Sequence, residues 1–115
     1  MTFHFDCIFY YASDVERSIR FYREILGLKF LFRGAVARFD IDDVLFEIVP
    51  APYQGKFLRG GNARLCLRAD DVVAALQELK SKGVATKEAE DKGDGILGLF
   101  EDPDGNEICL WQYKS

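Results

Sequence analysis

The stretch SDVERSIRFYREILG, residues 13–27, has a near copy in DDVVAALQELKSKG, residues 70–83. Each begins with side chains that can cap a helix, Ser13 with Glu16 in the first and Asp70 in the second. Apolar residues then recur at the i, i+4 and i+7 spacing of one helix face, and a glycine suited to a left-handed C-terminal cap follows. The pattern predicts two helices of the same design, at residues 13–26 and 70–82.

Strand signals surround both helices in the same order. One strand is predicted before each helix, and three more are predicted after it. The predicted strands span residues 7–11, 29–33, 36–41 and 44–49 in the first half, and residues 64–68, 84–88, 96–101 and 107–111 in the second. Tight turns are predicted at Asp42-Asp43 and at the type I sequence Asp102-Pro103-Asp104-Gly105, and a polar loop at residues 88–95.

We therefore predict an α+β fold of two tandem β-α-β-β-β modules. The matching caps, preceding strands and terminal glycines favour duplication over a chance likeness between two amphipathic helices. We expect a single domain at residues 1–115, with module one at about 1–49, a linker rich in glycine and proline at 50–62, and module two at about 63–115.

Composition limits the possible partners. The chain has 115 residues and a formal charge of -4 without a basic block, which gives no reason to expect nucleic acid or an anionic membrane as partner. No stretch approaches the length of a membrane helix, and the N-terminal residues do not resemble a secretory signal. The three cysteines have no C-x-x-C spacing, so we expect reduced thiols in a cytoplasmic protein.

Two motifs resemble one known family. The runs ASDVERSIRFYREILGLKF, residues 12–30, and FEDPDGNEICLWQ, residues 100–112, are similar to the vicinal oxygen chelate superfamily. That superfamily includes glyoxalase I, extradiol dioxygenases, fosfomycin-resistance enzymes and bleomycin-resistance binding proteins. The resemblance spans nearly the whole chain and implies an incomplete eight-stranded barrel around a cavity, often in a homodimer that covers exposed strand edges.

The resemblance also implies where metal ligands would stand. Metal-dependent members use two histidines and two carboxylates, which fall here on Cys7, Glu47, Arg64 and Cys109. Only Glu47 is retained, and the guanidinium of Arg64 has no lone pair to donate and would repel a divalent cation. We therefore predict no metal and no other cofactor. A soft metal held by Cys7, Glu47 and Cys109 remains an alternative, although Arg64 would lie close to it. The one histidine, His4, lies upstream of the mapped position.

Strand alternation predicts which residues line the cavity. The predicted ligand-binding residues are Cys7, Phe9, Tyr11, Glu47, Arg64, Arg68, Glu107, Cys109 and Trp111. Leu65, Leu67, Ile108 and Leu110 are expected to face the helix instead. A purely structural role is an alternative, with both cysteines acting as small apolar residues and Glu47 forming an internal ion pair with Arg64.

The leading functional hypothesis is a metal-free protein, similar to the bleomycin-resistance branch, that binds a small aromatic or carboxylate-bearing molecule. The ligand would stack on Trp111 or Tyr11 and be held by Arg64. A second hypothesis is a metal-independent lyase or isomerase, with Glu47 as the catalytic base and Arg64 as the oxyanion stabiliser. Less favoured hypotheses are a divalent-metal enzyme like glyoxalase, a cysteine nucleophile that would lack a histidine base, and a subunit without a ligand.

Overall fold

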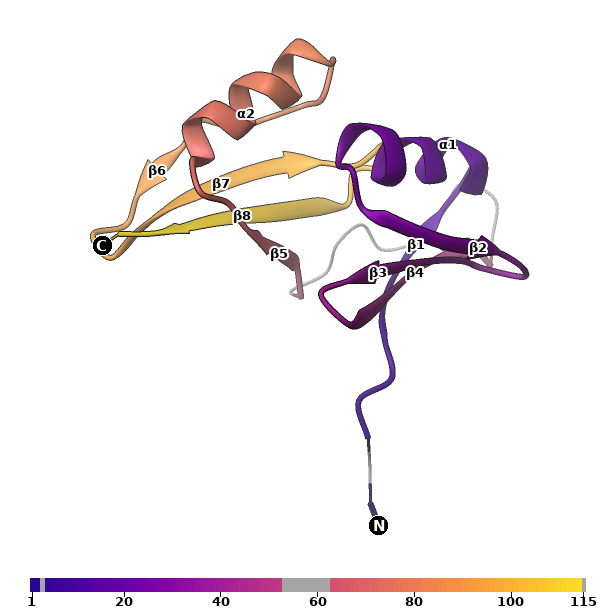
Figure 1. The fold of residues 1–115 in the computed structure, drawn as a ribbon. Helices are drawn as coiled ribbons and strands as arrows, with labels where there is room; N and C mark the ends of the chain where they lie inside the picture. Colours follow the sequence, from indigo (N-terminus) through magenta and orange to yellow (C-terminus); the bar gives the residue numbers. More distant parts are fainter. Residues whose placement is uncertain (3, 53–62, 115) are drawn as a thin grey trace. The chain divides into compact units, whose positions relative to one another are not determined.

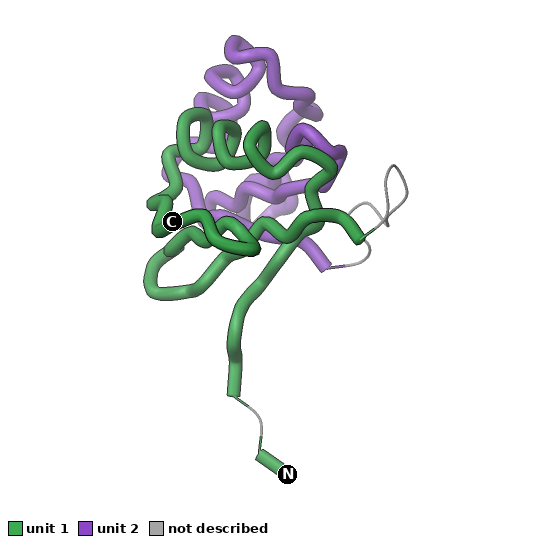
Figure 2. The backbone as a smooth tube through the Cα atoms, turned by 90° about the vertical axis from the view of Figure 1, so that its right-hand side faces the viewer, with its two compact units in different colours: residues 1–57 green, residues 58–115 purple. Residues whose placement is uncertain are grey.

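The computed structural model describes residues 1–2, 4–52 and 63–114. The chain forms two compact units, residues 1–57 and 58–115, shown in green and purple in Figure 2. Most of the predicted linker, residues 53–62, lies outside the described residues. No helix in the described ranges combines the length and the apolar character that crossing a membrane would need.

Unit 1 is a four-stranded sheet with one helix on it (Figure 1). Along the chain its elements are β1 (Ile8–Ala12), α1 (Val15–Arg20), the π-helical turn η1 (Phe21–Ile25), β2 (Lys29–Arg33), β3 (Ala37–Ile41) and β4 (Val44–Pro50). The strand order is β1-β4-β3-β2, with β1 parallel to β4 and the other neighbours antiparallel.

Unit 2 repeats this arrangement. Its elements are β5 (Leu65–Arg68), α2 (Val72–Ser81), β6 (Glu90–Asp91), β7 (Gly95–Glu101) and β8 (Glu107–Tyr113). The strand order β5-β8-β7-β6 matches that of unit 1, again with the first pair parallel and the rest antiparallel. The predicted α+β fold of two tandem modules is thereby confirmed.

In both helices the N-cap lies one residue after the predicted cap position. Asp14, not Ser13, is the N-cap of α1, and Asp71, not Asp70, is the N-cap of α2. Both aspartates have extended backbone, and their side chains accept hydrogen bonds from the main-chain N–H three residues later, at 3.1 and 3.0 Å. The Ser13 hydroxyl instead accepts from the Arg17 guanidinium.

The second unit departs from the prediction at one strand. Residues 84–88 form no strand of their own and make a single bridge, from Thr86 to Phe100. The strand β6 lies within the region predicted to be a loop. It forms because Gly93, with a positive φ of 93°, lets the chain reverse into a hairpin between β6 and β7. The main chain of Lys87 still donates to the Leu99 carbonyl, so residues 85–87 run along the edge of β7.

The predicted turn at the end of β7 is confirmed. The Gly105 N–H donates to the Asp102 carbonyl at 3.0 Å, as a type I turn requires, and Gly105 has a φ of 83°. The buried Asp102 carboxylate also accepts from the main-chain N–H of Asp104 and from both the main-chain and side-chain N–H groups of Asn106, at 2.8–2.9 Å. These bonds fix the start of β8.

In each unit, one face of the sheet packs on the helix. In unit 1 the buried face carries Phe39, Phe46 and Ile48, and the Tyr22 ring lies 5.0 Å from that of Phe46. In unit 2 this face carries Ile108 and Leu110, which are buried as expected, together with the buried Leu65 and Phe100. Because side chains alternate along a strand, the residues between these positions face the other way.

Candidate functional site

A row of four side chains crosses the sheet of unit 1 on the face away from α1. Phe9 of β1 pairs with Glu47 of β4, Glu47 pairs with Arg38 of β3, and Arg38 pairs with Phe32 of β2. The strands thus place one acidic and one basic side chain between two aromatic rings.

The four side chains are joined by specific contacts. Arg38 Nε donates to Glu47 Oε2 at 2.9 Å, and the Arg38 guanidinium lies 5.0 Å from the centre of the Phe32 ring, a cation–π distance. On the other side, Cys7 Sγ donates to Glu47 Oε1 at 3.5 Å. Both carboxylate oxygens of Glu47 therefore have a donor.

The acidic residue of this row is largely buried, whereas the other three are about half-exposed. The Glu47 side chain is 14% exposed and that of Arg38 is 43% exposed. Phe9 and Phe32 are 47% and 49% exposed, so about half of each residue's surface is open. Burial and the neighbouring Glu47 carboxylate raise the pKa of the Cys7 thiol to about 11, so Cys7 is protonated at neutral pH.

The corresponding face of unit 2 carries a second group of charges. Arg64 Nε donates to Glu107 Oε1 at 3.2 Å, and Lys87 Nζ donates to Glu107 Oε2 at 2.9 Å. The hydrogen bond from Lys87, together with that from Arg64, lowers the pKa of Glu107. Trp111 lies on the same face and pairs in register with Arg68 of β5.

Two cysteines also meet on this face. Cys66 of β5 and Cys109 of β8 are direct partners in the parallel ladder, so their side chains project side by side from adjacent strands. Although the residue Cys66 is exposed, burial of its sulfur raises the pKa of the thiol, and burial likewise raises that of Cys109.

The predicted site residues fall into two groups. Unit 1 holds Cys7, Phe9, Tyr11 and Glu47, and the structure brings Cys7 and Glu47 into contact. Unit 2 holds Arg64, Arg68, Glu107, Cys109 and Trp111, and it brings Arg64 and Glu107 into contact. Glu47 and Arg64 each have an oppositely charged partner within their own unit, and a mutual ion pair between them stays a prediction.

Sequence reasoning missed four residues of these faces: Phe32, Arg38, Cys66 and Lys87. The sequence does contain a signal for the contact of Arg38 with Glu47, because a two-residue turn at Asp42-Asp43 pairs position 41 with 44 and hence 38 with 47. The sequence contains no such signal for Phe32, because a bulge between Phe30 and Phe32 shifts its register with β3.

The residues at the mapped metal positions do not suit a divalent ion. Glu47 forms an ion pair with Arg38, and the guanidinium of Arg64 offers only donor groups. Among the residues that the structure describes, no three His, Cys, Asp or Glu side chains gather as metal ligands. His4 is exposed.

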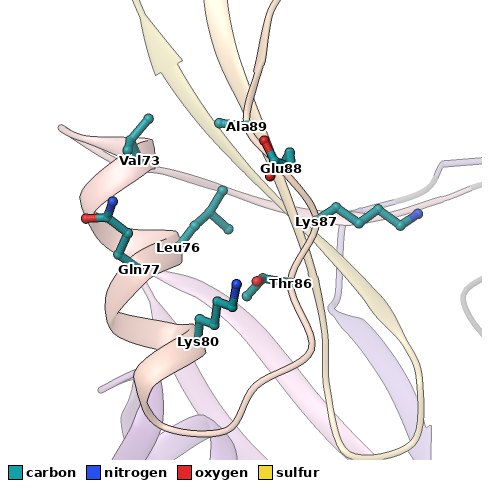
Figure 3. Close-up of a pocket in the computed structure, with 8 residues that line it drawn as sticks. All are labelled: Val73, Leu76, Gln77, Lys80, Thr86, Lys87, Glu88 and Ala89. Carbon is teal, nitrogen blue, oxygen red and sulfur yellow. The ribbon is translucent and has the colours of Figure 1, made fainter.

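Two hollows lie within unit 2. A groove of about 330 Å³ runs between α2 and residues 86–89, and the Lys80 side chain points across it toward Thr86 (Figure 3). None of the predicted site residues lines this groove. A smaller hollow of about 200 Å³ is lined by Glu107 together with Lys87, Phe100 and Glu101.

The structure thus contains two β-α-β-β-β modules with the same strand order. In each module, the sheet face away from the helix carries polar and aromatic side chains. These features define a class of α+β proteins that are built from paired modules. The family model described as Glyoxalase/Bleomycin resistance protein/Dioxygenase superfamily matches residues 4–110. The chain therefore belongs to this superfamily, and the resemblance noted from its motifs is confirmed. A comparison with curated protein sequences finds no match.

Solved structures of similar fold include binding proteins and enzymes. TnmS3, an antibiotic binding protein from Streptomyces sp. CB03234, is 29% identical with a TM-score of 0.76, over 99% of this chain and 100% of that one. The fosfomycin resistance protein FosX from Mesorhizobium loti is 16% identical with a TM-score of 0.76, over 99% and 95% of the two chains. Lactoylglutathione lyase from Agrobacterium tumefaciens is 17% identical with a TM-score of 0.77, over 95% and 92%. The last two likenesses concern the fold alone.

Proposed function

We propose that this protein binds a small planar molecule carrying a carboxylate or similar anionic group, and that it does so without a metal. The observation that carries the proposal is the Arg38–Glu47 ion pair, which lies between the half-exposed rings of Phe9 and Phe32 on one open sheet face. An aromatic surface with a few fixed polar groups is the usual composition of a small-molecule site.

The aromatic rings supply the apolar contact. Phe9 also makes an edge-on contact with Tyr11, 5.4 Å between ring centres, so the two rings form a continuous surface along β1. A flat ligand placed on such rings gains offset-stacked or edge-to-face contacts in addition to apolar burial. Trp111 and Tyr113, 6.0 Å apart on β8, offer a comparable pair in unit 2.

Arg38 supplies the anionic contact in unit 1. Its Nε donates to Glu47, while the two terminal amino groups of a guanidinium carry four further N–H donors in a plane that matches a carboxylate. Glu47 holds the arginine in place, so little side-chain freedom remains to be lost on binding. The residues predicted from the sequence in unit 1, namely Cys7, Phe9, Tyr11 and Glu47, remain in this proposal, and Phe32 and Arg38 join them. A ligand-binding role for those in unit 2, namely Arg64, Arg68, Glu107, Cys109 and Trp111, stays a prediction.

The comparisons support binding over catalysis. The relative with 29% identity over essentially both full chains is described as an antibiotic binding protein.

The predicted homodimer, cytoplasmic location and single-domain organisation stay predictions.

A metal-independent enzyme that uses Glu47 as its base has less support. Arg38 Nε donates to one oxygen of this carboxylate at 2.9 Å and Cys7 Sγ donates to the other at 3.5 Å, so both oxygens already accept hydrogen bonds from the protein. We therefore do not assign Glu47 a catalytic role.

A ligand screen tests the proposal. Purified protein in excess chelator is mixed with planar aromatic acids, their uncharged amide analogues, and aromatic antibiotics, and its thermal unfolding is followed. The proposal expects aromatic acids to raise the melting temperature with chelator present and the matched amides to raise it less. Stabilisation that disappears with chelator, or no stabilisation by any compound, would contradict the proposal.

A further inference from the structure

The strongest feature outside the aromatic row is the pair of sulfurs on β5 and β8. Cys66 and Cys109 are directly opposed in a parallel ladder, where adjacent strands lie about 4.8 Å apart. Both side chains leave the sheet on the face away from α2, because Leu65 and Ile108, the preceding paired residues, are buried on the helix side. As register partners, the two residues project their thiols side by side from adjacent strands.

Two arginines lie near this dithiol. Arg64 and Arg68 lie two residues before and after Cys66, so strand alternation puts all three on one face. Burial is the main reason that the pKa of the Cys109 thiol is raised; Cys66 and Glu107 raise it further, and Arg64 opposes the rise. Glu107 is the acidic neighbour, and it is already bonded to both Arg64 and Lys87.

The third side of the pair is apolar. Leu99 of β7 is the register partner of Cys109 on the strand opposite β5. No oxygen or nitrogen ligand is therefore supplied from that strand position, and a metal here would be held by sulfur. Among the described residues there is no cluster of three His, Cys, Asp or Glu side chains that could complete a tetrahedral zinc site.

We propose that Cys66 and Cys109 bind one monovalent soft metal ion, Cu⁺, between their two sulfurs. Thiolates are the ligands that select Cu⁺, and two of them on neighbouring strands suit a two-coordinate ion. Each thiol releases its proton to solvent as its sulfur binds the ion, and no electron is transferred. Two thiolates and one Cu⁺ carry a net charge of one negative unit, which Arg64 and Arg68 offset.

This site shares Cys109, Arg64 and Arg68 with the ligand-binding residues predicted from the sequence, but it shares no residue with the row that carries the proposed binding of a planar molecule. It lies in unit 2, whereas the row from Phe9 to Phe32 lies in unit 1, and it needs no organic ligand. Either proposal can fail while the other holds.

Competition with a coloured Cu⁺ chelator tests the site. Reduced, full-length protein is titrated without oxygen into the Cu⁺–bicinchoninate complex, and the loss of the complex's colour is measured. Wild-type protein is expected to remove one equivalent of Cu⁺. Cys66→Ser and Cys109→Ser should each abolish this, while Cys7→Ser serves as the matched control and should retain it. Arg68→Gln keeps both sulfurs and should weaken binding by about threefold, as expected for one charge at a few ångströms.

A footprint on the wild-type chain keeps the proposal testable if a variant fails to fold. One equivalent of Cu⁺ should slow alkylation of Cys66 and Cys109, measured by mass spectrometry, and leave the rate at Cys7 unchanged. Failure of the wild type to compete with the chelator, equal loss in Cys7→Ser and Cys66→Ser, or equal protection of all three thiols would overturn the proposal.

Discussion

Arg38 and Glu47 face each other across the two central strands of the first sheet, with Arg38 Nε 2.9 Å from Glu47 Oε2. Glu47 is the one residue retained from the metal set that the family resemblance implies, and here its partner is a permanent cation. The side chain that coordinates a metal in metal-dependent relatives thus orients an arginine in this protein. This relationship is the basis of the proposal that the sheet face of unit 1 binds its ligand without a metal.

Divalent metal titration should reveal no site at Glu47. Chelator-treated protein titrated with Mn²⁺ or Ni²⁺ should show no stoichiometric heat by calorimetry, because Arg38 already forms an ion pair with the carboxylate. Any weak heat should be the same in Glu47→Gln. Tight binding of one equivalent that is lost in Glu47→Gln would contradict the account.

The Cys7 thiol should react slowly with alkylating agents. Its pKa of about 11 leaves far less thiolate at pH 8 than an unperturbed cysteine has, so alkylation should be more than about tenfold slower in the folded than in the urea-unfolded chain. Glu47→Gln should speed it, because the carboxylate contributes to raising the pKa. The rates are measured by mass spectrometry, and equal rates in both states would count against the Cys7–Glu47 contact.

Gly95 should be needed for the position of Trp111. A Cβ atom at Gly95 would overlap the indole ring, so Gly95→Ala should shift the tryptophan emission and cost about 1–3 kcal/mol of unfolding free energy. Gly98→Ala is the matched control, since its Cβ would come within 2.8 Å of Val72 Cγ1 on α2 instead. The control should lose stability with little change in emission. An unchanged spectrum in Gly95→Ala would contradict the packing.

The side chain of Asp102 should contribute more to the free energy of unfolding than the Asp14 N-cap of α1 does. Asp102→Ala removes the acceptor of three N–H groups, two of them on the 2%-exposed Asn106, and should cost about 2–3 kcal/mol in urea unfolding. Asp14→Ala, which removes only the N-cap of α1, should cost about 1 kcal/mol. The reverse order of the two losses would show that the turn is not held by these bonds.

Much of the fold could be predicted because the two halves of the sequence carry the same series of helix and strand signals. Alternation located most strands to within one or two residues, and the glycines after both helices mark the ends correctly. Both N-caps are predicted one residue early, because Ser13 and Asp70 are as suitable by type as Asp14 and Asp71, and only backbone conformation decides between them. The π-helical turn at residues 21–25 has no sequence signal of this kind.

The candidate site was predicted less completely, for a physical reason. Family positions and strand alternation identify which residues share a face, but the contacts depend on register. The Asp42-Asp43 turn fixes the register that joins Arg38 to Glu47, so that contact was within reach. The parallel pairing of Cys66 with Cys109 joins segments more than 40 residues apart with no connecting turn, and the sequence does not encode it locally.

The most direct measurement is calorimetric titration of the best aromatic acid from the ligand screen, in excess chelator, into wild type and two arginine variants. Arg38→Gln removes the proposed anion contact, and Arg33→Gln removes a comparable but exposed ion pair with Glu16 in the same unit. We expect Arg38→Gln to weaken binding by about tenfold or more, or about 1.4 kcal/mol, and Arg33→Gln to leave it unchanged. Equal affinity in wild type and Arg38→Gln, or binding that requires a divalent metal, would contradict the account.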